Sequence, residues 1–208
     1  MDIQFYGANC ITLSNKQVRV VIDDTLAHLG AKTVTKEGDI SLFTFAHETL
    51  AAKSKVVIDM AGEYEVSGVS IYGIQSRAHM DTDKQRSATM YKISWNDTNV
   101  LVTGHVFPKL SDNDLEAIGM IDVMLVPVGG NGYTLDAAGA LQLIKQVEPK
   151  VVIPTHYADS ALNYEVPQQE LVDAIKTLGM EPKETTKKLQ FKPGEASDTT
   201  QLVILEKA

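Results

Sequence analysis

Short runs of β-branched and apolar residues, separated by Gly, Asn, Asp and Lys, recur along most of this chain and constrain its fold more than any other feature. In the first half these runs predict strands over residues 2–6, 10–14, 18–24, 40–45, 55–60, 68–76, 88–95 and 99–104. Helical patterns are expected there only over 48–54 and 111–120, and the second has Ser111 available as an N-cap. The first half is therefore expected to form mostly β-structure.

Strands and helices alternate in the second half of the sequence. Buried strands are expected over 121–128 and 150–156. Between them, the spacing of apolar residues predicts a helix from about 136 to 147, with Thr134 as its cap. A second helix is predicted from Pro167 in its first turn to a stop at Gly179. This alternation is typical of strands packed beneath helices.

The whole pattern predicts an α/β (α+β) fold. The last β-rich runs, 187–191 and 201–206, are expected to pair as a hairpin at a sheet edge. Two strand-rich halves, the second with interleaved helices, predict two packed sheets with helices on their outer faces. No linker divides the 208 residues, and 44% of them are hydrophobic, so we expect one domain over residues 1–208.

The composition argues against several classes of partner. No apolar stretch approaches the roughly 18 residues of a membrane helix, and the N-terminal residues lack the pattern of a signal peptide. The single cysteine, Cys10, rules out an intrachain disulfide and fits a reducing compartment. A net charge of -8 argues against binding to a phosphate backbone. We therefore expect a cytoplasmic protein with neither a membrane nor a nucleic-acid partner.

Four of the five histidines follow short hydrophobic runs. They are His47, His79, His105 and His156, whereas His28 lies in a segment that reads as a surface loop. Histidines gathered from separate strand ends onto one rim of a sheet provide the neutral imidazoles that a metal site needs. A structural, hydrogen-bonded histidine is the alternative at each single position. The pattern as a whole predicts a metal site.

Three stretches of the sequence carry a resemblance to a known family. They are IQFYGANCITL followed by VRVVIDD, then GEYEVSGVSIYGIQSRAH, and PVGGNGYTLDAAGALQLIKQVEPKVVIPTHY. Over about residues 1–160 the chain resembles the metallo-β-lactamase superfamily. Within that superfamily it looks most like the small metal-dependent hydrolases related to L-ascorbate 6-phosphate lactonase. The resemblance implies a four-layer αββα sandwich with metals bound at one edge between the two sheets.

The family's defining motif is altered in this chain. The family pattern is Thr-His-x-His-x-Asp-His, and residues 44–50 read Thr-Phe-Ala-His-Glu-Thr-Leu, so only His47 is kept. The resemblance places the third-site histidine at His79 and the last one at His156. The family's bridging aspartate corresponds to His105. A neutral imidazole has a single lone pair, so it cannot bridge two metal ions as a carboxylate does.

The resemblance therefore implies at most one metal ion per chain. His105 is expected to join His47 and His79, with or without His156. Three histidines and a water make a catalytic zinc site, whereas four histidines close the site and make it structural. The expected cofactor is zinc or another divalent transition metal, with one ion per chain at most or none.

Several other side chains are assigned roles as hypotheses. Without the motif aspartate, hydrolysis needs a base, with Glu48 or Asp81 as candidates and a metal-free histidine as a remote alternative. Arg77 is placed to pair with an anionic ligand, the alternative being a surface arginine. The loop Gly129-Gly130 offers backbone amides to an anionic substrate, or is simply a turn. Tyr133 is expected as a wall of the pocket.

Two functions of different classes remain open. The first is a divergent metal-dependent hydrolase that acts on a small anionic ester or lactone, and it predicts a pocket open to solvent. The second is a non-catalytic descendant that serves as a binding or scaffold protein, and it predicts a cavity closed by Phe45 and Leu50. Nucleic-acid processing is disfavoured by the acidic balance. The resemblance also implies self-association as a homo-oligomer, although no apolar stripe identifies an interface.

Overall fold

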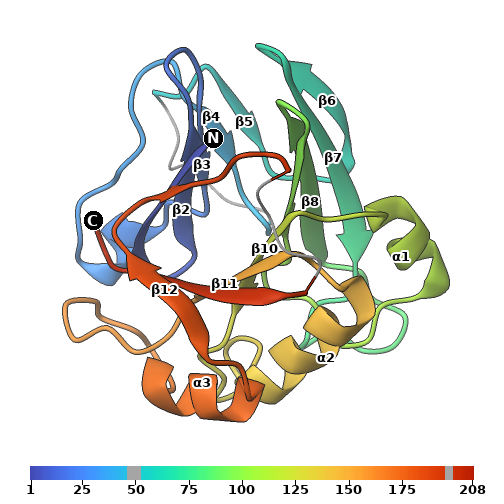
Figure 1. Ribbon diagram of the computed structural model, residues 1–208, viewed down its shortest axis with the longest axis vertical. Coiled ribbons are helices and arrows are strands. Elements are labelled where there is room, and N and C mark those ends of the chain that lie inside the picture. The colour runs from blue at the N-terminus through green and yellow to red at the C-terminus, as the bar shows by residue number, and fades with distance from the viewer. Residues whose placement is uncertain (46–52, 195–198) are drawn as a thin grey trace.

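The computed structural model describes residues 1–45, 53–194 and 199–208, and within them the chain forms two β-sheets and a few helices (Figure 1). The first sheet has the strand order β13-β1-β2-β3-β4-β5, and the second has the order β12-β14-β11-β10-β9-β8-β7-β6. The strands of the first sheet are β1 (Asp2–Gly7), β2 (Cys10–Ser14), β3 (Arg19–Ile22), β4 (Ile40–Leu42), β5 (Val56–Ile58) and β13 (Leu189–Gln190).

The strands of the second sheet are β6 (Gly62–Val66), β7 (Val69–Ser76), β8 (Ala88–Trp95), β9 (Thr98–Val102), β10 (Val123–Pro127), β11 (Val151–Thr155), β12 (Pro182–Thr186) and β14 (Gln201–Leu205). β6 to β9 form an antiparallel meander, whereas β9, β10, β11, β14 and β12 pair in parallel. In the first sheet β1 to β3 are antiparallel, and β3 to β5 are parallel. The expected sandwich of two sheets is confirmed.

The main core lies between the sheets, because each sheet turns one apolar face toward the other. Ile3 and Leu13 of the first sheet belong to the same buried cluster as Ile93 and Val100 of the second. The parallel strands β10 and β11 are buried on both faces, which explains their unbroken apolar sequences. Their second face is covered by helices.

Three α-helices cover the outer face of the second sheet: α1 (Asp112–Ile118), α2 (Ala137–Val147) and α3 (Leu171–Leu178). Figure 1 shows them on one side of the molecule, away from the first sheet. Over the first sheet, the described residues contain one short 3₁₀ helix, η1 (Leu26–Leu29), and connecting segments. Cys10 is buried beneath this layer, as expected for a small apolar side chain, and burial raises the pKa of its thiol. No helix in the described ranges is long and apolar enough to cross a membrane.

The chain end differs from the expected hairpin. β13 pairs with β1 in the first sheet, whereas β14 pairs with β11 and β12 in the second sheet, so the two predicted strands are not partners. β12 was not expected, because PKETT is polar and exposed as an edge strand. The predicted hairpin is wrong because short local patterns do not encode which sheet a strand joins.

Two helix starts also differ from the expected ones. α2 is capped by Asp136, whose Oδ1 accepts from Gly139 N at 2.7 Å, and not by Thr134. α3 begins after Glu170, several residues beyond Pro167. The intervening backbone is used elsewhere, since Gln169 N donates to Gly129 O at 2.7 Å. Gln169, which the local pattern assigned to the first helical turn, instead makes a tertiary hydrogen bond to Gly129.

Candidate active-site cavity

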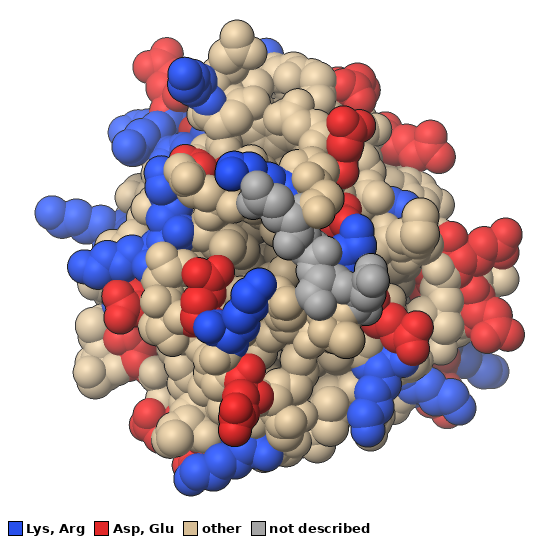
Figure 2. All heavy atoms as spheres, viewed as in Figure 1, with Lys and Arg blue, Asp and Glu red and all other residues tan. Residues whose placement is uncertain are grey.

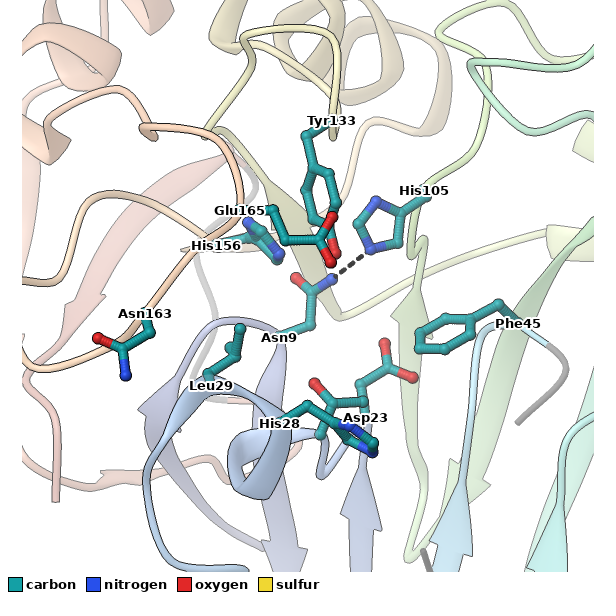
Figure 3. A pocket seen from close by; sticks show the side chains of 11 residues that line it. Asn9, Asp23, His28, Leu29, Phe45, His105, Tyr133, His156, Asn163 and Glu165 are labelled. Carbon is teal, nitrogen blue, oxygen red and sulfur yellow. Dashed lines mark hydrogen bonds between the residues drawn. The ribbon is translucent and has the colours of Figure 1, made fainter. Parts of the chain in front are cut away.

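A cavity of about 280 Å³ opens at the edge where the two sheets meet (Figure 3). It is formed by residues that follow β1, β3, β9 and β11, together with the loops beyond β10 and β11. The described residues that line it are Asn9, Asp23, Thr25, His28, Leu29, Phe45, His105, Tyr133, His156, Asn163 and Glu165. Phe45 contributes to the wall, and Leu50, the other residue expected to close the cavity, lies outside the described residues. His28, expected as a surface loop residue, is part of its rim.

Asn9 joins the two sheets at the cavity. It follows the turn at Ala8, which has a left-handed φ of 49° and whose carbonyl accepts from His156 N at 2.7 Å. The Asn9 side chain is only 8% exposed, and its Oδ1 accepts a hydrogen bond from Thr155 Oγ1 at 2.8 Å. Its amide nitrogen therefore points the other way and lies 3.2 Å from His105 Nε2, as the dashed line in Figure 3 marks.

His105 is held in a fixed orientation after Gly104. A Cβ atom on Gly104, whose φ is +57°, would lie 2.4 Å from Thr44 Cβ, so glycine is required at this close approach. Burial, together with the nearby His156 and His79, lowers the pKa of His105 to about 3, although a hydrogen bond to the Tyr133 backbone acts in the opposite direction. His105 is therefore neutral at physiological pH.

His156 is the second neutral imidazole of the cavity. It follows β11 with a left-handed φ of 53°, is 5% exposed, and has its ring centroid 5.4 Å from that of His105. Its Nδ1 lies 3.2 Å from Gln168 Oε1, and Gln168 Nε2 donates to Val166 O at 2.7 Å. We therefore assign the proton of His156 to Nδ1, which leaves the lone pair on Nε2. Burial lowers its pKa to about 4.

His79 is close to His105 but has a different set of partners. The ring centroids are 6.1 Å apart, and His79 Nδ1 and Nε2 lie 3.3 Å from His105 O and 3.2 Å from Gly132 O, respectively. Carbonyl oxygens only accept hydrogen bonds, so both nitrogens face acceptors. The ring lines an adjacent apolar groove of about 260 Å³, which shares Phe45, His105 and Tyr133 with the cavity. Ligation of a metal by His79 would require a carbonyl contact to be given up.

His105 and His156 are candidate metal ligands of the cavity, and two donors do not make a complete ligand set. His105 and His156 both present Nε2, and each has a hydrogen bond that orients the ring, as is usual for histidine ligands. Across residues 1–45, 53–194 and 199–208, no three His, Cys, Asp or Glu side chains are grouped so as to hold a metal ion. His47 and Glu48 lie outside the described residues, so their predicted roles stay predictions.

The other predicted site residues lie at different distances from the cavity. Tyr133 forms part of its wall, as expected. Asp81 is not among the lining residues. Its carboxylate accepts from Ala78 N and Ser87 N, and its pKa is lowered chiefly by the Ser87 hydroxyl. Arg77 does not reach the cavity either, because its guanidinium lies over the Phe107 ring and pairs with Asp83 at 2.8 Å. Its expected contact with a bound anion is not formed by this geometry.

Gly129 and Gly130 support the cavity from behind rather than lining it. A Cβ atom on Gly129 would lie 2.0 Å from His156 O and 2.2 Å from Gln168 Oε1. Gly130 has a left-handed φ of +66° in the turn before α2. Gly129 is therefore required by close packing against the His156 loop, and Gly130 by its left-handed backbone conformation.

Sequence reasoning missed Asp23, a buried carboxylate of the cavity. Asp23 Oδ1 and Oδ2 accept from Thr44 N and Thr44 Oγ1, both at 2.8 Å, and burial raises its pKa to about 6. Its position at the end of the strand VRVVI was the available signal. Asn9 and Gln168 carried none, because their roles depend on residues far away in the chain. Together with Glu165, Asp23 gives the cavity two carboxylates, and no described lining residue is Lys or Arg.

Comparison with known proteins matches this geometry to a family. A family model described as a Beta-lactamase superfamily domain matches residues 2–156. A metal-dependent hydrolase of Archaeoglobus fulgidus is 36% identical over 86 residues, which cover 40% of this chain and 35% of that protein. A metal-dependent hydrolase of Salinibacter ruber is 22% identical over 192 residues, which cover 76% of this chain and 84% of that protein.

Shorter and structural matches agree with these. A Thermoplasma acidophilum metal-dependent hydrolase is 45% identical over 47 residues, so the match spans only 20% of that protein. Among solved structures, a candidate Zn-dependent hydrolase of the metallo-beta-lactamase superfamily from Thermotoga maritima has a TM-score of 0.75 and 24% identity, and the match covers 98% of this chain and 97% of that one. The sandwich, the cavity between its sheets and the family match lead to one conclusion: this chain belongs to the metallo-β-lactamase superfamily.

Proposed function

We propose that this protein is a hydrolase of the metallo-β-lactamase fold, which holds at most one metal ion in the cavity between its sheets and hydrolyses a small ester or lactone. The observation that carries the proposal is that the cavity is open and presents the neutral imidazoles of His105 and His156, although Phe45 replaces a family histidine. The relatives named metal-dependent hydrolases support the same class of chemistry.

His105 and His156 are the residues that would hold the metal ion. Both are neutral near pH 7, so no proton has to be displaced from Nε2 before a cation binds. His47 stays the predicted third ligand, and imidazole donors favour zinc among the common divalent ions. A bound zinc ion would supply a water of lowered pKa, at about 7, and would polarise a substrate carbonyl.

The residues of the chain itself would orient and deprotonate the reactants. The Asn9 amide, held by Thr155, has N–H groups with which to bind a carbonyl oxygen. We assign the general base to Asp23, because it lines the cavity and its pKa of about 6 lies near the working pH. The alternative base Asp81 is engaged by Ser87 outside the cavity.

The charge of the cavity argues for an uncharged substrate. Asp23 and Glu165 are the carboxylates among its described lining residues, and none of those residues is Lys or Arg. Arg77, which was expected to bind an anion, is paired with Asp83 elsewhere. The described lining offers no Lys or Arg to pair with an anionic group, and Asp23 and Glu165 would balance the charge of a bound divalent ion, so we propose a neutral ester or lactone in place of an anionic one.

A non-catalytic binding protein is the second candidate function. It is favoured by the hydrogen bonds at the histidines, because the His105 lone pair is engaged by Asn9 and both His79 nitrogens face carbonyls. The His156 lone pair on Nε2 has no hydrogen-bond partner in the described structure, and the one lone pair of a neutral His79 faces a carbonyl oxygen. Such a descendant would keep the cavity for a ligand and bind no stoichiometric metal.

Elemental analysis decides between the two functions. We expect about one equivalent of zinc or another divalent transition metal per chain in protein purified without chelators or a histidine tag. His156→Asn should lose this metal while keeping the fold, because Asn tolerates a left-handed φ and retains a group to pair with Gln168. Neutral p-nitrophenyl esters should be hydrolysed at least tenfold faster than their carboxylated analogues. Absence of metal after incubation with zinc, together with no esterase activity, would contradict the hydrolase.

A further inference from the structure

Asn9 follows a strand of the first sheet and makes side-chain hydrogen bonds to the second sheet. It leaves the first sheet after β1 and reaches two residues of the second sheet's edge, Thr155 and His105 (Figure 3). The hydrogen bond to Thr155 is buried and shielded from competing water, whereas the hydrogen bond to His105 is part-buried and faces the cavity. A side chain that is hydrogen-bonded across the two sheets in this way restrains the residues it contacts, here Thr155 and His105.

The direction of each hydrogen bond follows from its donors. The Thr155 hydroxyl bonds the Asn9 carbonyl oxygen, and this contact orients the carboxamide so that its NH₂ group faces His105. An NH₂ group has no lone pair to offer, so His105 Nε2 must be the acceptor. The proton of neutral His105 then resides on Nδ1, on the side of the Tyr133 backbone hydrogen bond. Asn9 thus selects one tautomer of His105.

We propose that Asn9 is a positioning residue that holds His105 in the Nδ1–H tautomer, and that a metal ion entering the cavity has to displace the Asn9 amide from Nε2. The same lone pair cannot accept a hydrogen bond and ligate a cation. The second half of this inference rests on the proposed function, whereas the first half does not.

The proposal makes Asn9 a determinant of metal affinity. In the described arrangement the amide keeps Nε2 directed into the cavity, which favours the ligand orientation. It also engages the lone pair that a cation would need, so a cation would have to replace one part-buried hydrogen bond. One such bond corresponds to roughly a fivefold change in affinity. The net effect of Asn9 is therefore to weaken metal binding while pre-orienting the ring.

The tautomer is tested on metal-free protein by long-range ¹H–¹⁵N NMR of the histidine side chains. The wild-type protein should show His105 protonated at Nδ1, with an unprotonated Nε2 shifted by its hydrogen bond. Asn9→Asp, which keeps the size and the Thr155 contact, removes the donor and should move the His105 proton to Nε2. Asn113→Ala, a surface asparagine of α1, is the control and should change neither resonance. A wild-type His105 protonated at Nε2 would overturn the proposal.

The displacement is tested by zinc titration against a chromophoric chelator, without any activity measurement. Asn9→Ala should bind zinc roughly fivefold more tightly than wild type, Asn9→Asp more tightly still because it adds an anionic oxygen, and Asn113→Ala as wild type does. Equal or weaker binding by Asn9→Ala, with Asn9→Asp unchanged as well, would exclude displacement. Zinc bound by none of these proteins would contradict the proposed function and with it the displacement, and the NMR result would still decide the tautomer.

Discussion

At the scale of single residues, the neutral state of the cavity histidines depends on burial. His105 and His156 lie in an interior that disfavours the imidazolium form, and their pKa values fall to about 3 and about 4, respectively. Asp23 is shifted in the opposite sense, to about 6, because burial disfavours its carboxylate. Protons therefore compete with a metal for these imidazoles only at pH values well below the ordinary histidine pKa of 6.5.

These shifts predict how stability depends on pH in metal-free protein. Between pH 6 and about 4 the unfolded chain binds protons at both histidines that the native protein excludes, which lowers stability as pH falls. Over the same pH range Asp23 binds a proton in the native state but not in the unfolded chain, and this stabilising effect offsets the destabilising effect of one of the two histidines. His156→Asn removes one proton that is taken up on unfolding. The slope of its free energy of unfolding against pH should therefore be smaller than that of wild type by about 1.4 kcal/mol per pH unit.

Urea denaturation at a series of pH values, with chelator present, measures this difference. Above about pH 7.5 all three groups have the same charge in both states, and the two curves should run parallel there. Parallel curves over the whole range would show that His156 is not held neutral.

Gly129 is a second residue whose identity is set by packing. Gly129→Ala places a Cβ atom 2.0 Å from the His156 carbonyl oxygen, so backbone has to move, and we expect a loss of about 3 kcal/mol in stability. Gly132→Ala in the same loop is the matched control. Its φ of +75° is strained for alanine, but nothing lies within 4 Å, so about 1 kcal/mol is expected. Equal losses in chemical denaturation would refute the packing role.

At the scale of elements, the N-cap of α2 differs from the one that local residue preferences predict. Thr134 has the residue type of an N-cap, yet its Oγ1 is buried without a hydrogen-bond partner in the described structure. Asp136 makes the capping bond to Gly139 N. Two candidate caps two residues apart are indistinguishable by type, and the loop path that starts at Gly130 decides between them.

This difference predicts opposite effects for two substitutions. Asp136→Ala should cost about 1 kcal/mol, because it removes a helix cap. Thr134→Val keeps the side-chain shape and removes an unpaired buried hydroxyl, so stability should stay equal or rise by up to about 1 kcal/mol. Thermal and urea unfolding of both variants provides the measurement. Destabilisation by Thr134→Val would reveal a hydrogen bond or a buried water at that hydroxyl.

At the scale of the whole molecule, the cavity forms where the two sheets are joined. His156 N donates to Ala8 O, and Thr155 donates to Asn9, so the contacts that shape the site also hold the sheet edges together. A ligand of the cavity should therefore stabilise the entire fold. Acidic and basic side chains both occur on the face seen in Figure 2.

Zinc at 100 times its Kd should add about 2.7 kcal/mol to the free energy of unfolding. For a chain of this length that corresponds to a rise in Tm of roughly 5–10 °C. The rise should be much smaller in His156→Asn, because a ligand is missing. Differential scanning fluorimetry with and without zinc measures both proteins. An equal rise in the two would place the bound zinc elsewhere on the protein.

The sequence by itself determined the strands of the first half other than β6, the buried parallel strands β10 and β11, the helix of residues 112–118 and the family. These follow from local periodicity and from motifs whose residues are close together in the chain. It also identified His105 and His156 as polar residues at strand ends. The terminal strands 187–191 and 201–206 were identified as strands, but their pairing was not.

Only the tertiary structure decided which of these groups meet and in what state. Asn9 and Thr155 are 146 positions apart, and their hydrogen bond sets the tautomer that we assign to His105. Arg77 is turned away from the cavity by Phe107 and Asp83, and Asp23 is brought to it beneath Thr44. Lone pairs, pKa values and access depend on neighbours across the two sheets, and no local pattern in the chain encodes those neighbours.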